Sequence, residues 1–112
     1  EDGNHERLDT VVAEATRILE NRLRSLAGAP PECVGVDLVQ HAFGTETPPL
    51  VVSDIGAEQK AAHLLYRGVF GFIRNQMHHR LVGTLTPDRA LQILGMIDYL
   101  LHLAEGASKK GT

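Results

Sequence analysis

The chain has 112 residues, the usual size of one domain, and its 43 % hydrophobic and 4 % aromatic residues, with no Trp, predict an aliphatic core. No run of about 18 apolar residues occurs, which excludes a membrane span, and the single Cys33 excludes an internal disulfide and a cysteine-rich zinc site. The formal net charge of −3 argues against a protein that coats nucleic-acid duplexes, but it leaves room for a small cationic site.

The N-terminal residues 1–6 are polar and acidic, unlike a secretory signal, and there is no initiator Met. We therefore expect a piece of a longer protein or a processed form, in the cytoplasm and away from membranes. The first helix follows at once, and Gly28 and Pro30-Pro31 end it. Its apolar residues recur at steps of three and four, as in an amphipathic core helix: Leu8, Val11, Val12, Ala15, Ile18, Leu19, Leu23 and Leu26.

Residues 29–56 form an irregular connection in this interpretation. A short helix is expected within it at Val36–Phe43, with Asp37 near its start. Residues 47–52 must be extended, because residues before proline avoid the helical region. Ser53 and Asp54 then offer caps for the next helix.

A long third helix is predicted from Ala57 to Val82, ended by Gly83. At about 100° per residue, one stripe of this helix is apolar: Tyr66, Phe70, Ile73, Met77 and Leu81, widened by Ala62, Leu65 and Val69. The opposite arc is polar or small: Arg67, Gly68, Gly71, Arg74, Asn75, His78 and His79. The third helix should therefore bury one face and expose the other.

The last helix begins with Thr86 as N-cap and Pro87 at the first helical position, and Gly106 ends it. Its apolar faces come from five residues: Leu91, Leu94, Ile97, Leu101 and Leu103. The pattern predicts an all-α fold, a small helical bundle over residues 5–105 with a disordered tail over residues 106–112.

Two glycines interrupt the polar arc of the third helix. Each costs roughly 1 kcal/mol relative to Ala in a helix interior, so Gly68 and Gly71 indicate a close approach by another backbone. That backbone belongs either to a second molecule or to the first or last helix of the same chain. In the second case, His78 and His79 would only complement the helix dipole.

A series of motifs extends over most of residues 5–105. The motifs, in order, are Gly35–Val39, Ala42-Phe43, Pro48–Leu50, Ser53-Asp54, Tyr66–Asn75 and His79-Arg80. Their order resembles the Ymh family of bacterial and phage proteins. Through that family the chain resembles the HEPN superfamily of all-α domains, whose signature is an Arg followed four to six residues later by a His. The resemblance implies a HEPN-like bundle.

In this chain the signature is Arg74-Asn75-Gln76-Met77-His78-His79. The resemblance implies an RNA-binding hydrolase, a metal-independent ribonuclease of toxin or antiviral defence systems, which dimerises so that two motifs form one cleft. Ymh relatives commonly have Pro after the Asn, where this chain has Gln76. A proline would bend the helix and re-aim the His, and the adjacent His78 is a second candidate for its role.

These side chains match the needs of RNA self-cleavage. An imidazole, that of His79 or His78, can move the proton of a 2′-OH near neutral pH, and the Arg74 guanidinium can neutralise the developing phosphate charge. Asn75 can hold the imidazole tautomer or a phosphate oxygen. Arg74 lies about 140° around the helix from His79, so two protomers assemble the site better than one. We expect a homodimer that acts on RNA.

A metal site is the other interpretation of His78-His79. Adjacent helical residues point about 100° apart and seldom bind one ion, and His63 is far along the helix, so we expect neither a metal nor another cofactor. His41 and His102 are interpreted as packing residues, and Cys33 has no catalytic role.

Two rivals to the endoribonuclease stay open. The first is a non-catalytic HEPN-like module that dimerises or senses nucleic acid while other domains of the full-length chain act. The acidic net charge and Gln76 favour it. The second is a plain structural bundle within a larger complex.

Overall fold

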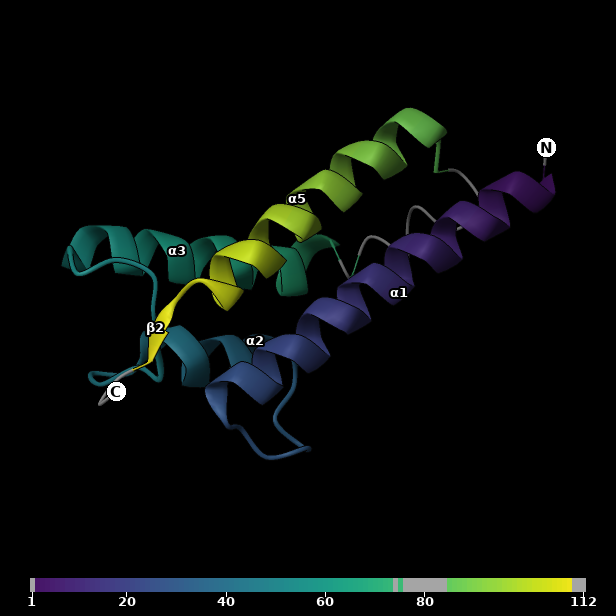
Figure 1. Ribbon diagram of the computed structural model, residues 1–112. Coiled ribbons are helices and arrows are strands. Elements are labelled where there is room, and N and C mark those ends of the chain that lie inside the picture. Colours follow the sequence, from purple (N-terminus) through teal and green to yellow (C-terminus); the bar gives the residue numbers. More distant parts are fainter. Residues whose placement is uncertain (1, 74, 76–84, 110–112) are drawn as a thin grey trace.

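The chain folds as an all-α protein, as the sequence predicted. The computed structural model describes residues 2–73, 75 and 85–109 (Figure 1). Two long helices, α1 (Asp2–Ala27) and α5 (Pro87–Glu105), lie side by side and run in the same direction. The Arg22 Nε donates a hydrogen bond to Glu105 Oε2 at 2.9 Å where both helices end. The α1 helix ends at Gly28, whose φ of 67° is the left-handed conformation that glycine adopts without strain.

The connection after α1 contains the expected short helix. It consists of α2 (Gly35–Val39) and a π-helical turn, η1 (Gln40–Gly44). The buried Glu20 carboxylate of α1 accepts a hydrogen bond from the Gly35 backbone N–H at 2.7 Å. The Arg24 Nε donates to the Cys33 carbonyl at 2.9 Å. Two side chains of α1 therefore hold the loop that leads into α2.

The C-terminal segment pairs with the extended segment that the prolines predicted. Strand β1 (Leu50–Val51) lies antiparallel to β2 (Ser108–Lys109), with Leu50 opposite Lys109. Two residues of the predicted tail over residues 106–112 thus form a strand. Backbone pairing needs no apolar side chain, so the polar composition did not reveal it.

The third helix begins at Gly56 as α3 (Gly56–Gly68) and continues as a second π-helical turn, η2 (Val69–Ile73), and Asn75 is also helical. Its predicted end at Val82 and Gly83 lies outside the described residues. Its N-cap is Ile55, so the prediction that Ser53 or Asp54 caps it is wrong. The Ser53 Oγ instead accepts from the Ile55 N–H at 3.1 Å and donates to Glu58 Oε1 at 2.6 Å. Ser53 thus braces the turn that precedes the helix.

The core side of the third helix contains three residues of the predicted apolar stripe, and the other two, Met77 and Leu81, lie outside the described residues. Tyr66 and Phe70 are buried and Ile73 is half-buried. The Tyr66 ring stacks on Phe43, with centroids 4.4 Å apart, and its hydroxyl donates to the Leu100 carbonyl at 2.6 Å. Tyr66 therefore joins α3 to both η1 and α5.

The last helix has the predicted ends. The Thr86 Oγ1 accepts from the Arg89 N–H at 3.2 Å, and Gly106 is the C-cap. Leu91, expected on an apolar face, is instead 68 % exposed. The face of α5 that packs is made of Ala90, Ile93, Ile97, Leu100 and Ala104. In the ranges that the structure describes, no helix has the length and apolar character needed to cross a bilayer.

Candidate functional site

The predicted site lies at the end of the third helix. Of its members, Asn75 is described: it is helical and exposed. Arg74, His78 and His79 lie outside the described residues, as does Gln76. The described part of this region is therefore the helix that precedes the motif, α3 with η2.

The two glycines of this helix have different surroundings. A Cβ added at Gly68 would meet nothing within 4 Å, whereas one at Gly71 would lie 3.8 Å from Val36 Cγ1 of α2, an ordinary contact. Among the described residues, no atom of α1 or α5 comes within 4 Å of a Cβ at either glycine, so the first and last helices do not pack closely there. A π-turn advances less per residue than the α-helical value of about 100°, which rotates Gly71 away from Gly68 and toward α2.

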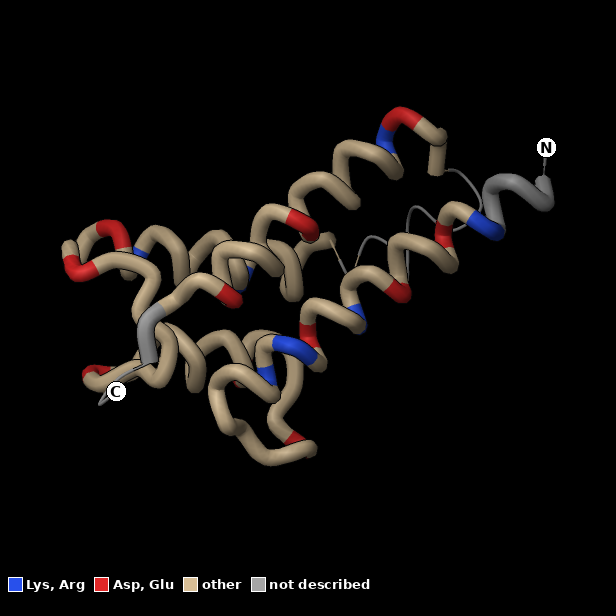
Figure 2. Tube along the Cα trace, in the orientation of Figure 1, with Lys and Arg blue, Asp and Glu red and all other residues tan. Residues whose placement is uncertain are grey.

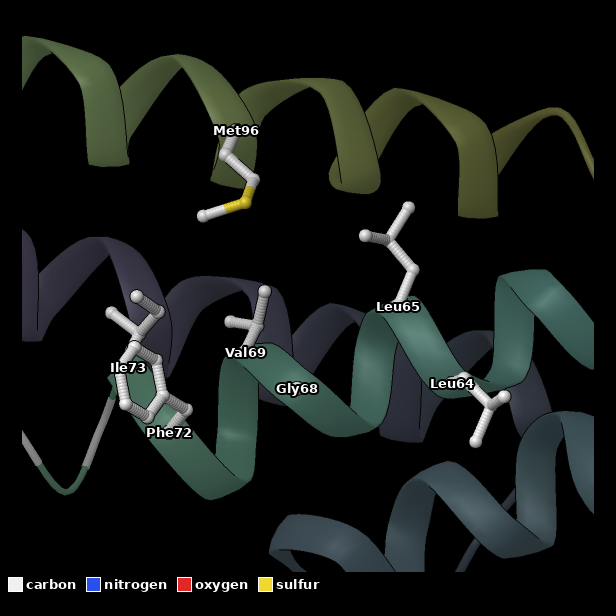
Figure 3. Close-up of a pocket in the computed structure, with 7 residues that line it drawn as sticks. All are labelled: Leu64, Leu65, Gly68, Val69, Phe72, Ile73 and Met96. Carbon is white, nitrogen blue, oxygen red and sulfur yellow. The ribbon is translucent and has the colours of Figure 1, made fainter.

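An apolar groove lies between the third helix and α5, and we call it the α3–α5 groove. Its volume is about 480 Å³. Figure 3 shows its lining: Leu64, Leu65, Gly68, Val69, Phe72, Ile73 and Met96. Leu64, Leu65 and Phe72 are 53 %, 44 % and 61 % exposed. The sequence analysis placed Leu65 in the core and did not predict the groove. The large apolar residues one turn before and one turn after Gly68 could have indicated it.

The α3 helix carries two basic residues and one acidic residue. Lys60 and Arg67 are exposed on this helix, and Glu58 in its first turn is its one acidic residue (Figure 2). The third helix is thus locally basic in a chain whose net charge is −3.

The imidazole of His63 is turned into the protein. Its Nε2 is buried and has no hydrogen-bond partner among the described residues, and its Cε1 lies 2.7 Å from where a Cβ of Gly44 would be. Burial first, and the nearby Arg67 second, lower the pKa of His63. His63 is therefore neutral at neutral pH and belongs to the contact between α3 and η1, away from the motif.

His102 and His41, the other two histidines whose side chains the structure describes, do not form a second site. His102, expected to be a packing residue, is exposed: its Nδ1 lies 2.9 Å from the Asp98 carbonyl oxygen and 3.4 Å from Asp98 Oδ1. That carbonyl first, and the carboxylate second, raise the pKa of His102. His41 is half-buried and Cys33 is a free thiol. Over residues 2–73, 75 and 85–109, no group of three His, Cys, Asp or Glu side chains could hold a metal ion.

The fold and the site define an all-α domain whose third helix leads, past an exposed apolar groove, into an Arg-Asn motif. The chain belongs to the Ymh family: the model of that family, described as a protein of unknown function (Hypoth_ymh), matches residues 2–103. No curated protein and no solved structure matches the chain. The family predicted from the sequence motifs is confirmed over nearly the whole chain.

Proposed function

We propose that the protein is a metal-independent endoribonuclease of the HEPN-like kind, which acts in the cytoplasm in a bacterial or phage defence or toxin system. The observation that carries the proposal is the exposed, basic face of the third helix. It displays Lys60 and Arg67 and leads to the exposed Asn75, within the run Arg74–His79. A phosphate backbone binds to accessible basic surfaces of this kind.

The proposed reaction is an internal transfer at one phosphate. His79, or its neighbour His78, accepts the proton of the 2′-OH, and the 2′-oxygen forms a bond to phosphorus as the bond to the 5′-oxygen breaks. The protonated imidazole then gives this proton to the leaving 5′-oxygen, which yields a 2′,3′-cyclic phosphate and a 5′-OH and restores the neutral imidazole. Arg74 neutralises the charge that develops on the phosphate oxygens, and Asn75 orients the imidazole or the phosphate. No step requires a metal ion.

A homodimer completes this site. With Arg74 and His79 about 140° apart on a regular helix, the groups of one copy do not converge on one phosphate. A second copy brings the Arg of one chain near the His of the other. The exposed apolar groove beside the same helix supports a partner at this position.

Purified protein incubated with single-stranded RNA and EDTA tests the proposal. We expect cleavage that resists the chelator and leaves 2′,3′-cyclic phosphate ends. His79→Ala should abolish it, and His102→Ala is the matched control because His102 is an exposed histidine on another helix. Cleavage that disappears with EDTA and returns only with added metal would contradict the mechanism.

A non-catalytic module is the second candidate. The net charge of −3 and the Gln76 in place of the usual proline favour it. In that case the protein dimerises or senses nucleic acid, and other domains of a longer chain supply the activity. RNA that is bound but left intact, with wild-type binding by His79→Ala, would support this candidate over the enzyme.

A further inference from the structure

Phe72 is an aromatic side chain that the fold leaves open to solvent. Of the five aromatic residues in the chain, three are buried, whereas Phe72 is 61 % exposed and Tyr99 is 60 % exposed. Phe72 lies at one end of the α3–α5 groove, and Leu64 lies at the other (Figure 3). Asn75 follows Phe72 by only three residues, so we call the Phe72 end the motif end of the groove.

The second wall of the groove is α5, which runs antiparallel to the third helix. The Tyr66 hydroxyl donates to the Leu100 carbonyl, and farther along the third helix Val69 and Ile73 line the groove together with Met96. Residue numbers on α5 therefore fall as the third helix advances. The residues of α5 that precede Met96 lie toward the motif end (Figure 3).

Two exposed polar side chains of α5 belong to this end. Gln92 and Arg89 precede Met96 by four and seven residues, which places all three on one side of the helix. Gln92 carries an amide that can donate and accept hydrogen bonds, and Arg89 carries a guanidinium that can pair with a phosphate. The apolar surface at Phe72 thus has an amide and a cation on the facing helix.

The acidic residues of α3 and α5 lie off the groove side or beyond the other end of the groove. On a helical projection of α5, three of them lie opposite Met96 or about a quarter turn from it: Asp98, Glu105 and Asp88. Glu58 precedes Leu64 by six residues and so lies past the end farther from the motif. An apolar surface facing a cation suits a ligand that joins a flat ring to a negative charge, as a nucleotide does.

We infer that the motif end binds one unpaired base of an RNA strand, which stacks on Phe72. Every base has a π-face, and aromatic side chains bind single strands by stacking on it. Gln92 then reads the edge of the base, and Arg89 binds its phosphate. The groove volume of about 480 Å³ is that of a small-molecule site, for which about 300–1,000 Å³ is usual.

The base site depends on the proposed function and defines its substrate. A base that enters the groove must leave its stack, so the strand is single beside the cleaved phosphate and a duplex is excluded. Because every base can stack, the hydrogen bonds between Gln92 and the base edge decide which base is preferred. A base at the motif end leaves the Leu64 end of the groove to the partner copy of the proposed homodimer.

A single-stranded oligonucleotide that cannot be cleaved tests the base site. In this probe fluorine replaces every 2′-OH, and one uridine is 5-iodouridine, which crosslinks under ultraviolet light to an aromatic ring on which it stacks. We expect mass spectrometry to map the crosslink of the wild type to Phe72. This measurement needs no variant, so it does not depend on whether a substitution is tolerated.

Variants test the same site by fluorescence anisotropy with the uncleavable probe. Phe72→Ala should weaken binding roughly tenfold, and Phe72→Tyr, which keeps a ring, should bind as the wild type does. Tyr99→Ala is the matched control, because Tyr99 is almost equally exposed but follows Met96, away from the motif end. Gln92→Ala should alter the preference among bases, whereas Arg89→Ala should weaken all probes alike. Circular dichroism verifies that each variant is folded.

Several outcomes would overturn the base site: a wild type that does not bind the probe, crosslinks only at other residues, or a Phe72→Ala variant that binds as tightly as the wild type. A Phe72→Ala monomer where the wild type is a dimer, with no crosslink at Phe72, would assign this end to a protein contact and overturn it too. A probe bound at Phe72 while ordinary RNA stays intact would leave the base site standing and the ribonuclease refuted. RNA cleaved at the wild-type rate by Phe72→Ala would do the reverse.

Discussion

The pKa of His63 is lowered and that of His102 is raised, which shows how local surroundings set the protonation of a side chain. His63 faces η1, its Nε2 is buried with no hydrogen-bond partner in the part of the chain that the structure describes, and its pKa is lowered, chiefly by burial. His102 is exposed beside the Asp98 carbonyl and carboxylate, and its pKa is raised. The sequence offers the same imidazole at both positions, so the difference arises from what surrounds each ring.

The lowered pKa of His63 predicts a loss of stability in acid. Below the usual histidine pKa of 6.5 the unfolded chain binds a proton at His63 that the folded chain binds less readily, so the free energy of unfolding falls as pH falls through this range. His63→Gln should reduce this dependence in urea unfolding measured from pH 7.5 to pH 5. His102→Asn should steepen it, since a raised pKa stabilises the folded chain in acid. Equal pH slopes in all three proteins would contradict the assignment.

A side chain at Gly44 should destabilise the fold. Its Cβ would lie 2.5 Å from Gln40 Oε1 and 2.7 Å from His63 Cε1, so those side chains must move. We expect Gly44→Ala to lower the free energy of unfolding by about 1–3 kcal/mol in urea titrations. Gly95→Ala, at an open position within α5, should raise it by up to about 1 kcal/mol. An unchanged free energy of unfolding in Gly44→Ala would show that the side chains of Gln40 and His63 move aside at little cost.

The motif residues should be needed for cleavage and not for folding. Loss of the imidazole in His79→Ala should reduce RNA cleavage by roughly 10²–10⁴, the usual contribution of a general acid or base. Arg74→Ala should have a similar effect, and Arg74→Lys should restore only part of the rate because Lys lacks the planar fork. If His78→Ala abolishes cleavage while His79→Ala does not, His78 is the functional histidine. Wild-type rates in all these variants would leave the motif with a structural role only.

Among the elements, the two π-turns are the features that regular helical spacing does not predict. η2 directs Gly71 toward Val36 of α2, whereas Gly68 lines the α3–α5 groove. A projection at about 100° per residue placed both glycines on one arc. The hydrogen-bond spacing of a helix depends on what packs against it, so this rotation belongs to the contact between η2 and α2.

The anchor between α1 and the start of α2 should contribute measurably to stability. Glu20→Ala removes the acceptor of the Gly35 N–H and the partner of Arg24, whose Nη2 lies 4.0 Å from Glu20 Oε1. We expect a loss of about 1–3 kcal/mol in urea unfolding. Glu14→Ala, which breaks an exposed pair with Arg17 on the same helix, should cost at most about 1 kcal/mol. Equal losses would show that the anchor is no stronger than a surface ion pair.

At the scale of the whole molecule, the C-terminal segment closes the fold. α1 and α5 pack along each other, and β2 then pairs with β1, which Leu50 ties to the core (Figure 1). Ala107 also packs against the core. The segment after the last helix is therefore part of the domain through Lys109.

Removal of this segment should weaken the fold. A chain that ends at Gly106 loses the pairing of β1 with β2 and the contact of Ala107, so we expect its thermal unfolding to begin several degrees lower. A chain that ends at Lys109 keeps both features and is the matched control. An unchanged midpoint in the shorter chain would mean that the strand pair adds nothing to stability.

The sequence by itself determined the ends of most helices, the buried stripe at Tyr66 and Phe70, and the family. These depend on signals carried by neighbouring residues, such as the Thr86-Pro87 cap, the glycines at helix ends and the order of motifs. Tertiary structure alone decided which way Gly71 faces, that His63 is turned inward, and that β2 finds β1. Each of those depends on a partner distant in the chain, and the free energy of such a contact does not exist until the chain has folded.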